Sequence, residues 1–160
     1  SNTVQKNKGH LIMSNKNQFK LVNEMQEMAM DGKNFYRLNK QTNQLTIDYV
    51  KKSDDMLFFQ KMFYKAEENF YLNLVDEIKI DKKKIYVIKL TPREESNQLF
   101  KEIKLWIIDK TWEVPKFEMI DLNDNKTNFK ILELNIDKKF ELNDFRIKSN
   151  EHTEIIDLRL

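Results

Sequence analysis

Residues 100–108 read FKEIKLWII, and their alternation decides the fold class. Ile103, Leu105 and Ile107 fall on one face of an extended chain, whereas Trp106 falls on the other. A period of two is that of a β-strand with one buried face. The segment therefore predicts a sheet strand whose inner face carries aliphatic side chains.

Similar short segments, separated by polar turns, occupy most of the chain. The sequence holds only two glycines and two prolines, so we expect Asn and Asp, which tolerate left-handed backbone, to form the turns. Asp31-Gly32 is the clearest dipeptide for a tight hairpin. The predicted strands cover residues 3–14, 19–30 (as one strand or two), 34–38, 45–49, 70–80, 84–91, 100–108, 114–122, 127–136, 145–148 and 154–158.

The period changes between residues 53 and 69. Phe58, Phe59, Met62 and Phe63 follow helical spacing, and they predict one amphipathic helix rich in Phe and Met. About ten strands and one helix favour a mainly β, α+β fold. We expect a large, curled antiparallel sheet, partly closed, with helical material across it.

Composition excludes several function classes. The 160 residues include 34% charged side chains, but the net charge is only +2 and no basic cluster is interleaved with aromatic residues, so we expect no nucleic-acid partner. The absence of cysteine excludes disulfides, thiol catalysis and thiolate metal sites. No apolar run reaches the roughly 20 residues of a membrane span.

Catalytic chemistry has few candidate residues. His10 and His152 are the only histidines, and neither has a partner that the sequence can identify. The carboxylate pairs Asp54-Asp55 and Glu94-Glu95 lie in polar segments, where solvation keeps carboxylates alike rather than splitting them into acid and base. With so few glycines, a glycine-rich phosphate loop is absent. The sequence therefore predicts a protein that is not an enzyme and has no cofactor or metal.

Large, flexible apolar side chains are unusually frequent for so charged a chain. There are eleven Phe and seven Met residues, and methionine is common on surfaces that accept varied apolar partners. Two interpretations stay open from the pattern alone. Either the helix covers the sheet and these side chains fill a solid core, or helix and sheet enclose a cavity that admits acyl chains.

Several short motifs follow one another along nearly the whole chain. They are Gly9, Leu11, Phe19, residues 30–33 (MDGK), 90–92 (LTP), 103–111 (IKLWIIDKT), 123–125 (NDN) and 127–129, Phe145, and 155–159 (IIDLR). In this order they resemble the LolA-type outer-membrane lipoprotein carriers of the LolA/LolB/RseB-like superfamily, and most of all the versions in Bacteroidetes-like bacteria. The resemblance implies an incomplete β-barrel with a helical lid over an apolar cavity, in a single domain spanning residues 1–160.

The resemblance also implies a function. Carriers of this kind take acylated lipoproteins from an inner-membrane lipoprotein-releasing transporter and shuttle them across the periplasm towards the outer membrane. We therefore expect a periplasmic location, with a signal peptide already removed ahead of Ser1-Asn2. The implied lid is the helix from Asp55 to Asn69. The implied cavity and lid residues are Leu11, Met13, Phe19, Leu21, Met28, Met30, Phe35, Leu57, Phe58, Phe59, Met62, Phe63, Leu105 and Ile107.

Two departures from the family pattern bear on this expectation. Asn15 and Lys16 stand where many members have an Arg-Pro pair that helps to hold the lid. Only eight residues precede Gly9, so we expect the family's N-terminal helix to be missing and the barrel to be more open. Other functions stay open: a lipoprotein- or peptide-binding acceptor, an envelope sensor of the same fold, or a protein-interaction domain with a solid core.

Overall fold

The computed structural model describes residues 6–50, 57–93, 100–136 and 138–159. Their backbone divides into two compact units. The first comprises residues 1–57 and 138–160, and the second comprises residues 58–137. Each unit is described by itself below.

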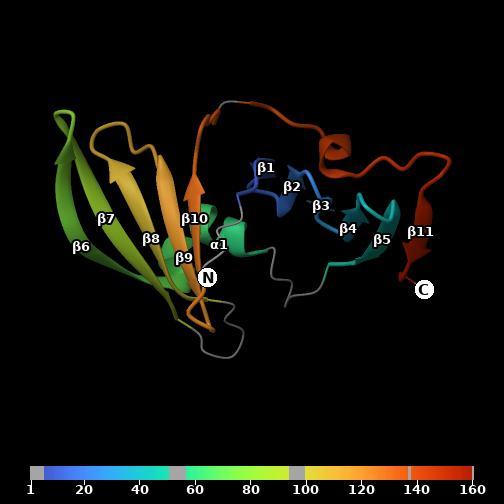
Figure 1. Ribbon diagram of the computed structural model, residues 1–160, viewed down its shortest axis with the longest axis horizontal. Coiled ribbons are helices and arrows are strands. Elements are labelled where there is room, and N and C mark those ends of the chain that lie inside the picture. The colour runs from blue at the N-terminus through green and yellow to red at the C-terminus, as the bar shows by residue number, and fades with distance from the viewer. Residues whose placement is uncertain (1–5, 51–56, 94–99, 137, 160) are drawn as a thin grey trace. The chain divides into compact units, whose positions relative to one another are not determined.

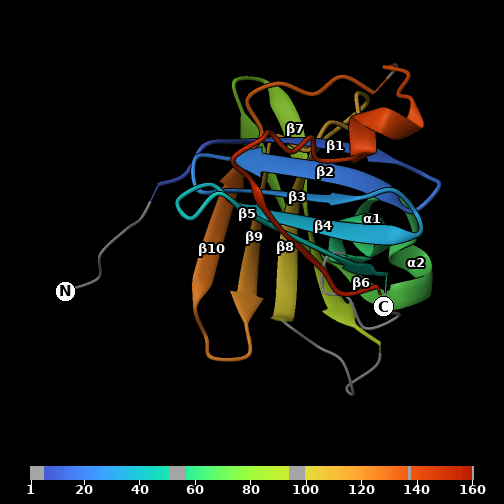
Figure 2. The same ribbon diagram turned by 90° about the vertical axis from the view of Figure 1, so that its right-hand side faces the viewer.

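The first unit is built on a six-stranded sheet, here called sheet A (Figures 1 and 2). Its strands β1 to β5 form an antiparallel meander in chain order, and β11 then pairs parallel with β5. A 3-10 helix, η1, precedes β11. The elements are β1 (Gly9–Ser14), β2 (Gln18–Asn23), β3 (Gln26–Met30), β4 (Asn34–Asn39), β5 (Gln44–Tyr49), η1 (Leu142–Phe145) and β11 (Glu154–Asp157).

The second unit is an antiparallel five-stranded sheet, sheet B, with two short helices ahead of it in the chain (Figure 1). Its strands also follow chain order, so neighbouring strands of the sheet are consecutive in the sequence. The elements are α1 (Leu57–Tyr64), α2 (Ala66–Asn69), β6 (Phe70–Ile80), β7 (Lys83–Pro92), β8 (Phe100–Ile108), β9 (Lys116–Asp121) and β10 (Lys126–Lys130).

The predicted mainly β, α+β class is confirmed. Most strand pairs are antiparallel, the helices are few and short, and neither sheet closes into a barrel within the part of the chain that the structure describes. No helix among these residues is both long and apolar enough to cross a membrane. Whether residues 1–160 act as a single domain of the carrier type stays a prediction.

Turn formation follows the expected residue types in part, since Lys82, Lys110 and Trp112 also have positive φ. Asn17, Asn43, Asp81 and Asp124 all have positive φ and end strands in tight turns. Gly32 has a φ of 95° in the β3–β4 turn, a conformation that glycine adopts without a steric penalty. At these four turns Asn and Asp adopt the left-handed backbone that glycine commonly adopts in other proteins.

Four predicted elements differ from the structure. The strand expected over residues 3–14 begins at Gly9, and residues 6–8 are not part of it. Lys65 has a φ of −138° and leaves the helical region, so the expected single helix is divided into α1 and α2. The strand expected over residues 127–136 ends at Lys130, because its next neighbour across the sheet is Pro115, which has no N–H to donate. The strand expected over residues 145–148 is absent, because Phe145 ends the 3-10 helix η1.

Candidate functional site

The two faces of sheet B differ in chemistry, and their difference follows from strand register. Leu90, Ile103 and Met119 lie in one cross-strand row, and Ile88, Leu105 and Phe117 lie in the next. Residues directly opposite one another share a face, so both rows lie on the same side of the sheet. This side, here called the helix-side face, carries the apolar core of the unit.

Helix α1 packs against this core. Met62 is buried within the cluster of core residues, and the Phe63 ring meets the Phe117 ring edge-on at a centroid distance of 6.3 Å. Phe117 in turn stacks on Phe129 at 4.3 Å. Beneath Met62 and Phe63 the core is therefore filled by ordinary aromatic and aliphatic packing.

The helix-side face continues beyond the filled core onto the edge strand β6. Leu72 and Leu74 pair with Leu90 and Ile88, so they point to the same side as the core. Their exposed fractions are 44% and 57%, although leucine is usually buried in folded proteins. This apolar edge, defined by Leu72 and Leu74, is the candidate ligand surface of the second unit.

The predicted cavity residues on sheet A share one face. Leu11, Leu21 and Met28 form one cross-strand row, and a second row two positions along carries the others. Because both rows have the same parity on every strand, all seven side chains point to one side. The second row contains Met13, Phe19, Met30 and Phe35.

The remaining predicted residues lie in the second unit or in α1. Met62, Leu105 and Ile107 belong to the filled core, and Phe63 lies at its margin, 37% exposed. Leu57, Phe58 and Phe59 lie in α1, but their side chains fall outside the described residues, as do Asp55 and Met56. Sequence reasoning missed Leu72 and Leu74, although their i, i+2 spacing with Phe70 was the signal for one strand face.

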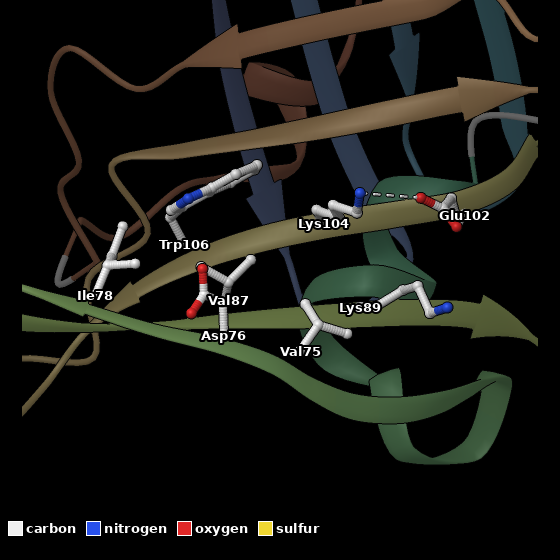
Figure 3. Close-up of a pocket in the computed structure, with 8 residues that line it drawn as sticks. All are labelled: Val75, Asp76, Ile78, Val87, Lys89, Glu102, Lys104 and Trp106. Atoms are coloured by element: carbon white, nitrogen blue, oxygen red, sulfur yellow. Dashed lines mark ion pairs between the residues drawn. The ribbon is translucent and has the colours of Figure 1, made fainter.

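The opposite face of sheet B carries a shallow hollow of about 430 Å³ (Figure 3). Val87 and Trp106 lie across from each other in it, and Lys89 lies across from Lys104. Lys104 forms an ion pair with Glu102 at 3.5 Å, and the Lys116 ammonium lies 4.0 Å from the centre of the Trp106 ring. Internal pairing thus occupies much of the polar lining, and the hollow offers a weaker candidate site than the apolar edge.

Asp31, a buried acid with a strongly lowered pKa, is a structural anchor. Its side chain is 2% exposed and accepts hydrogen bonds from the backbone N–H of Lys33 and Asn34, at 3.0 and 2.8 Å, and from the Tyr36 hydroxyl at 3.0 Å. The Arg146 Nε, 115 residues along the chain, donates a further bond at 3.0 Å. Since its partners all belong to its own chain, Asp31 joins the β3–β4 turn to the C-terminal segment rather than facing a substrate.

These bonds determine the pKa of Asp31. Burial raises the pKa, but the hydrogen bonds from the two backbone N–H groups, Arg146 and Tyr36 outweigh this effect. The net result lowers the pKa of Asp31 from 3.8 to about 2. The same contacts raise the pKa of Tyr36, whose burial and proximity to the Asp31 carboxylate disfavour ionisation. Neither group is therefore placed to exchange protons near neutral pH.

We expect this pKa shift to appear in acid stability. A folded-state pKa below the ordinary value means that the native state favours the carboxylate, so the stabilisation is complete above pH 3.8 and is lost as the pH falls towards 2. Urea unfolding at about pH 5 and about pH 2.5 should show that Asp31 contributes a drop of up to about 2 kcal/mol in the free energy of unfolding, and Asp31→Asn should remove this part of the pH dependence.

Asp157 complicates that measurement in a testable way. The Arg159 side chain and backbone N–H donate to it and lower its pKa to about 2, but it lies at the surface. High salt should therefore weaken its contribution and leave that of the buried Asp31. An acid slope unchanged by Asp31→Asn at high salt would contradict the role of the anchor.

Metal chemistry has no evident centre among the described residues, where no group of three or more His, Asp or Glu side chains could hold an ion. His10 is exposed on the edge strand β1, and His152 is exposed beside Glu151 at 3.5 Å. The two histidines thus give no support to a shared site.

Comparison with known proteins gives a fold but no family. No family model matches the chain. An uncharacterized protein of Methanocaldococcus jannaschii is 26% identical over 106 residues, which are 64% of this chain and 31% of that protein. The chain therefore spans about a third of the length of this curated relative.

Three solved structures are similar. An uncharacterized conserved protein from Thermus thermophilus matches 93% of this chain and 80% of its own, with a TM-score of 0.59 and 11% identity. A putative outer membrane lipoprotein-sorting protein domain from Vibrio parahaemolyticus matches 82% and 66%, with 0.47 and 11%. A LolA superfamily protein from Nitrosomonas europaea matches 75% and 58%, with 0.42 and 12%. The first of these likenesses supports the fold alone, and the other two are too distant to assign a family.

Proposed function

We propose that this chain is a carrier of the LolA type that binds the acyl chains of lipoproteins on the helix-side face of sheet B. The observation that carries the proposal is the apolar edge, where Leu72 and Leu74 continue the core face but are left open to solvent. The motif order of the sequence, which resembles that family along nearly the whole chain, gives this edge its proposed ligand.

An exposed apolar edge beside a helix suits a ligand that must be both held and released. Each CH₂ group removed from water contributes about 0.8 kcal/mol, so even a short stretch of acyl chain gains useful affinity. Phe63 and Tyr64 at the end of α1 are themselves partly exposed, which gives an acyl chain aromatic contacts without opening the filled core. A small movement of α1 would then uncover more of the helix-side face, as the proposed lid role requires.

The proposal extends to partners and place. Acyl chains of lipoproteins do not cross water unshielded, so a carrier of this kind would receive them from an inner-membrane lipoprotein-releasing transporter and act in the periplasm. The face of sheet A that bears the partly exposed Leu11, Met13 and Leu21 is proposed as a second apolar lining. Because the chain spans only about a third of its curated relative, the activity and partners of a longer protein that contains it also form part of this proposal.

Acyl-probe binding tests the proposed ligand. We expect a fluorescent fatty-acyl probe to bind saturably, and Leu74→Asp to weaken that binding about tenfold or more, because a charge replaces roughly 2 kcal/mol of apolar contact. Ile80→Asp is the matched control, since Ile80 lies on the same strand and is 50% exposed but pairs on the opposite face of the sheet. It should leave the affinity for the probe unchanged.

Two results would contradict the proposal. If the folded protein binds no acyl probe, the apolar edge does not recognise lipid. If Leu74→Asp and Ile80→Asp weaken binding equally, the probe recognises exposed apolar surface in general. Circular dichroism of each variant establishes that the sheet is intact before affinities are compared.

A further inference from the structure

One end of sheet B gathers exposed apolar side chains at the tips of its strands. The β6–β7 turn, the β8–β9 connection and the end of β10 all lie at this end (Figure 1). Ile80, Trp112 and Leu132 belong to these three segments, with exposed fractions of 50%, 69% and 69%. They are here called the rim.

The rim residues are fixed by backbone pairing. The Trp112 N–H donates to the Ile108 carbonyl at 2.9 Å, and the Ile131 N–H donates to the Pro115 carbonyl at 2.8 Å, which places Leu132 beside the β8–β9 connection. Trp112 has a φ of 59°, a conformation that is unfavourable for a large side chain. The strained turn holds the Trp112 side chain in solvent, where most of its apolar surface is not packed against the unit.

The spread of the rim points to a flat partner. Five strands at about 4.8 Å spacing separate the edges of the sheet by roughly 19 Å, with Trp112 between Ile80 and Leu132. Side chains so far apart in a row do not form a pocket for a small ligand. They can all contact one plane.

The charge around the rim favours an anionic plane. Seven lysines lie at this end of the sheet against five acids, of which Glu77 is already paired with Lys84 at 2.8 Å. Lys82, Lys83 and Lys110 are exposed in the same turns as Ile80 and Trp112. The lysines are Lys79, Lys82, Lys83, Lys84, Lys110, Lys116 and Lys130, and the acids are Glu77, Asp81, Asp109, Glu113 and Glu133.

We propose that the rim binds the surface of an anionic lipid membrane, with Trp112 entering the interface and the turn lysines contacting the head groups. Tryptophan is favoured at the boundary between head groups and acyl chains, and nearby lysines add electrostatic attraction. The inference does not depend on acyl-chain binding, because its residues are distinct from the apolar edge.

Vesicle flotation tests the rim. The full chain should float with vesicles of equal parts phosphatidylcholine and phosphatidylglycerol, and much less with phosphatidylcholine alone or at high salt. Trp112→Ser should reduce the partition coefficient about tenfold, and Trp112→Phe should restore most of it. Leu122→Ser is the control, because Leu122 is 51% exposed in the β9–β10 turn at the other end of the sheet.

A pair of charge variants tests the electrostatic part. Lys83 lies at the same end of the sheet as the rim, whereas Lys101 lies at the other end, near the start of β8. Lys83→Glu and Lys101→Glu change the net charge of the chain by the same amount. Lys83→Glu should weaken binding about fivefold or more, whereas Lys101→Glu should have little effect. The acyl-probe affinity should stay unchanged in the rim variants, which separates this proposal from the proposed carrier function.

Any of three results would overturn the proposal. The first is that the folded chain fails to float with anionic vesicles. The second is that Leu122→Ser reduces flotation as much as Trp112→Ser does, and the third is that Lys83→Glu and Lys101→Glu have equal effects. A rim that captures a protein but no vesicles would likewise overturn it, since the partner would then be a polypeptide surface.

Discussion

Replacing Asp31 by alanine should lower the free energy of unfolding by about 3 kcal/mol or more at neutral pH. The change removes the acceptor of the Asn34 and Lys33 backbone N–H groups and of the buried Tyr36 hydroxyl, and it leaves the Arg146 guanidinium without its ion-pair partner. Buried donors left without acceptors cost about 1–3 kcal/mol each, although Arg146 is partly exposed and can regain water. Urea unfolding followed by circular dichroism measures the loss.

An exposed carboxylate provides the control for this prediction. Glu77 forms an ion pair with Lys84 at 2.8 Å, but both side chains are exposed. Glu77→Ala should therefore cost less than about 1 kcal/mol. If the two alanine variants lose similar stability, the buried network around Asp31 contributes no more than a surface ion pair, and its assignment as an anchor is wrong.

The strands of this fold were largely predictable because their signals are local. In residues 102–108 each side chain's face follows from its own parity, and the observed face of Trp106 is opposite to that of Leu105, as predicted. Phe100 departs from this pattern, because the pairing with β9 shifts register between Phe100 and Glu102 and Phe100 lies in the core cluster. The turns at Asn17 and Asn43 were predictable for the same reason, since the side chain itself lowers the cost of left-handed backbone.

The elements that were mispredicted depend on partners elsewhere in the chain. The strand predicted over residues 145–148 is absent, and its first residue ends η1, where Glu141 and Asp144 bond reciprocally across the first turn of the 3-10 helix. Left-handed backbone at Lys110 and Trp112 has no signal in those residue types. The bond between Arg146 and Asp31 joins positions 115 apart, which no local pattern can identify.

The candidate site was predictable only in part. The resemblance implied the seven sheet A residues, and the structure places them on one face. Their role in acyl binding stays a prediction. Leu72 and Leu74 were missed because alternation shows which side chains share a face but not which part of that face a helix leaves uncovered.

Replacing Phe117 by alanine should lower the free energy of unfolding by about 3–5 kcal/mol. Phe117 is 5% exposed, stacks on Phe129 and supports the Phe63 ring of α1, so its removal opens a void where the helix meets the sheet. Phe117→Leu should cost less, about 1.5 kcal/mol, because it keeps most of the apolar volume. Thermal and urea unfolding of both variants measure the difference.

A double-mutant cycle on Phe117 and Phe63 then tests the docking of α1 itself. Aromatic pairs in contact contribute about 0.5–1.5 kcal/mol beyond their buried area, so the two substitutions to alanine should be coupled by an amount in that range. Coupling near zero would mean that α1 does not rest on Phe117 in solution. In that case Phe63→Ala should also leave the affinity for the acyl probe unchanged. If α1 is docked and Phe63 contacts the ligand, Phe63→Ala should instead bind the probe less tightly. Unfolding experiments would thus measure how far the contact between Phe63 and Phe117 stabilises the core. Probe binding would measure whether the exposed end of α1 also contacts the ligand.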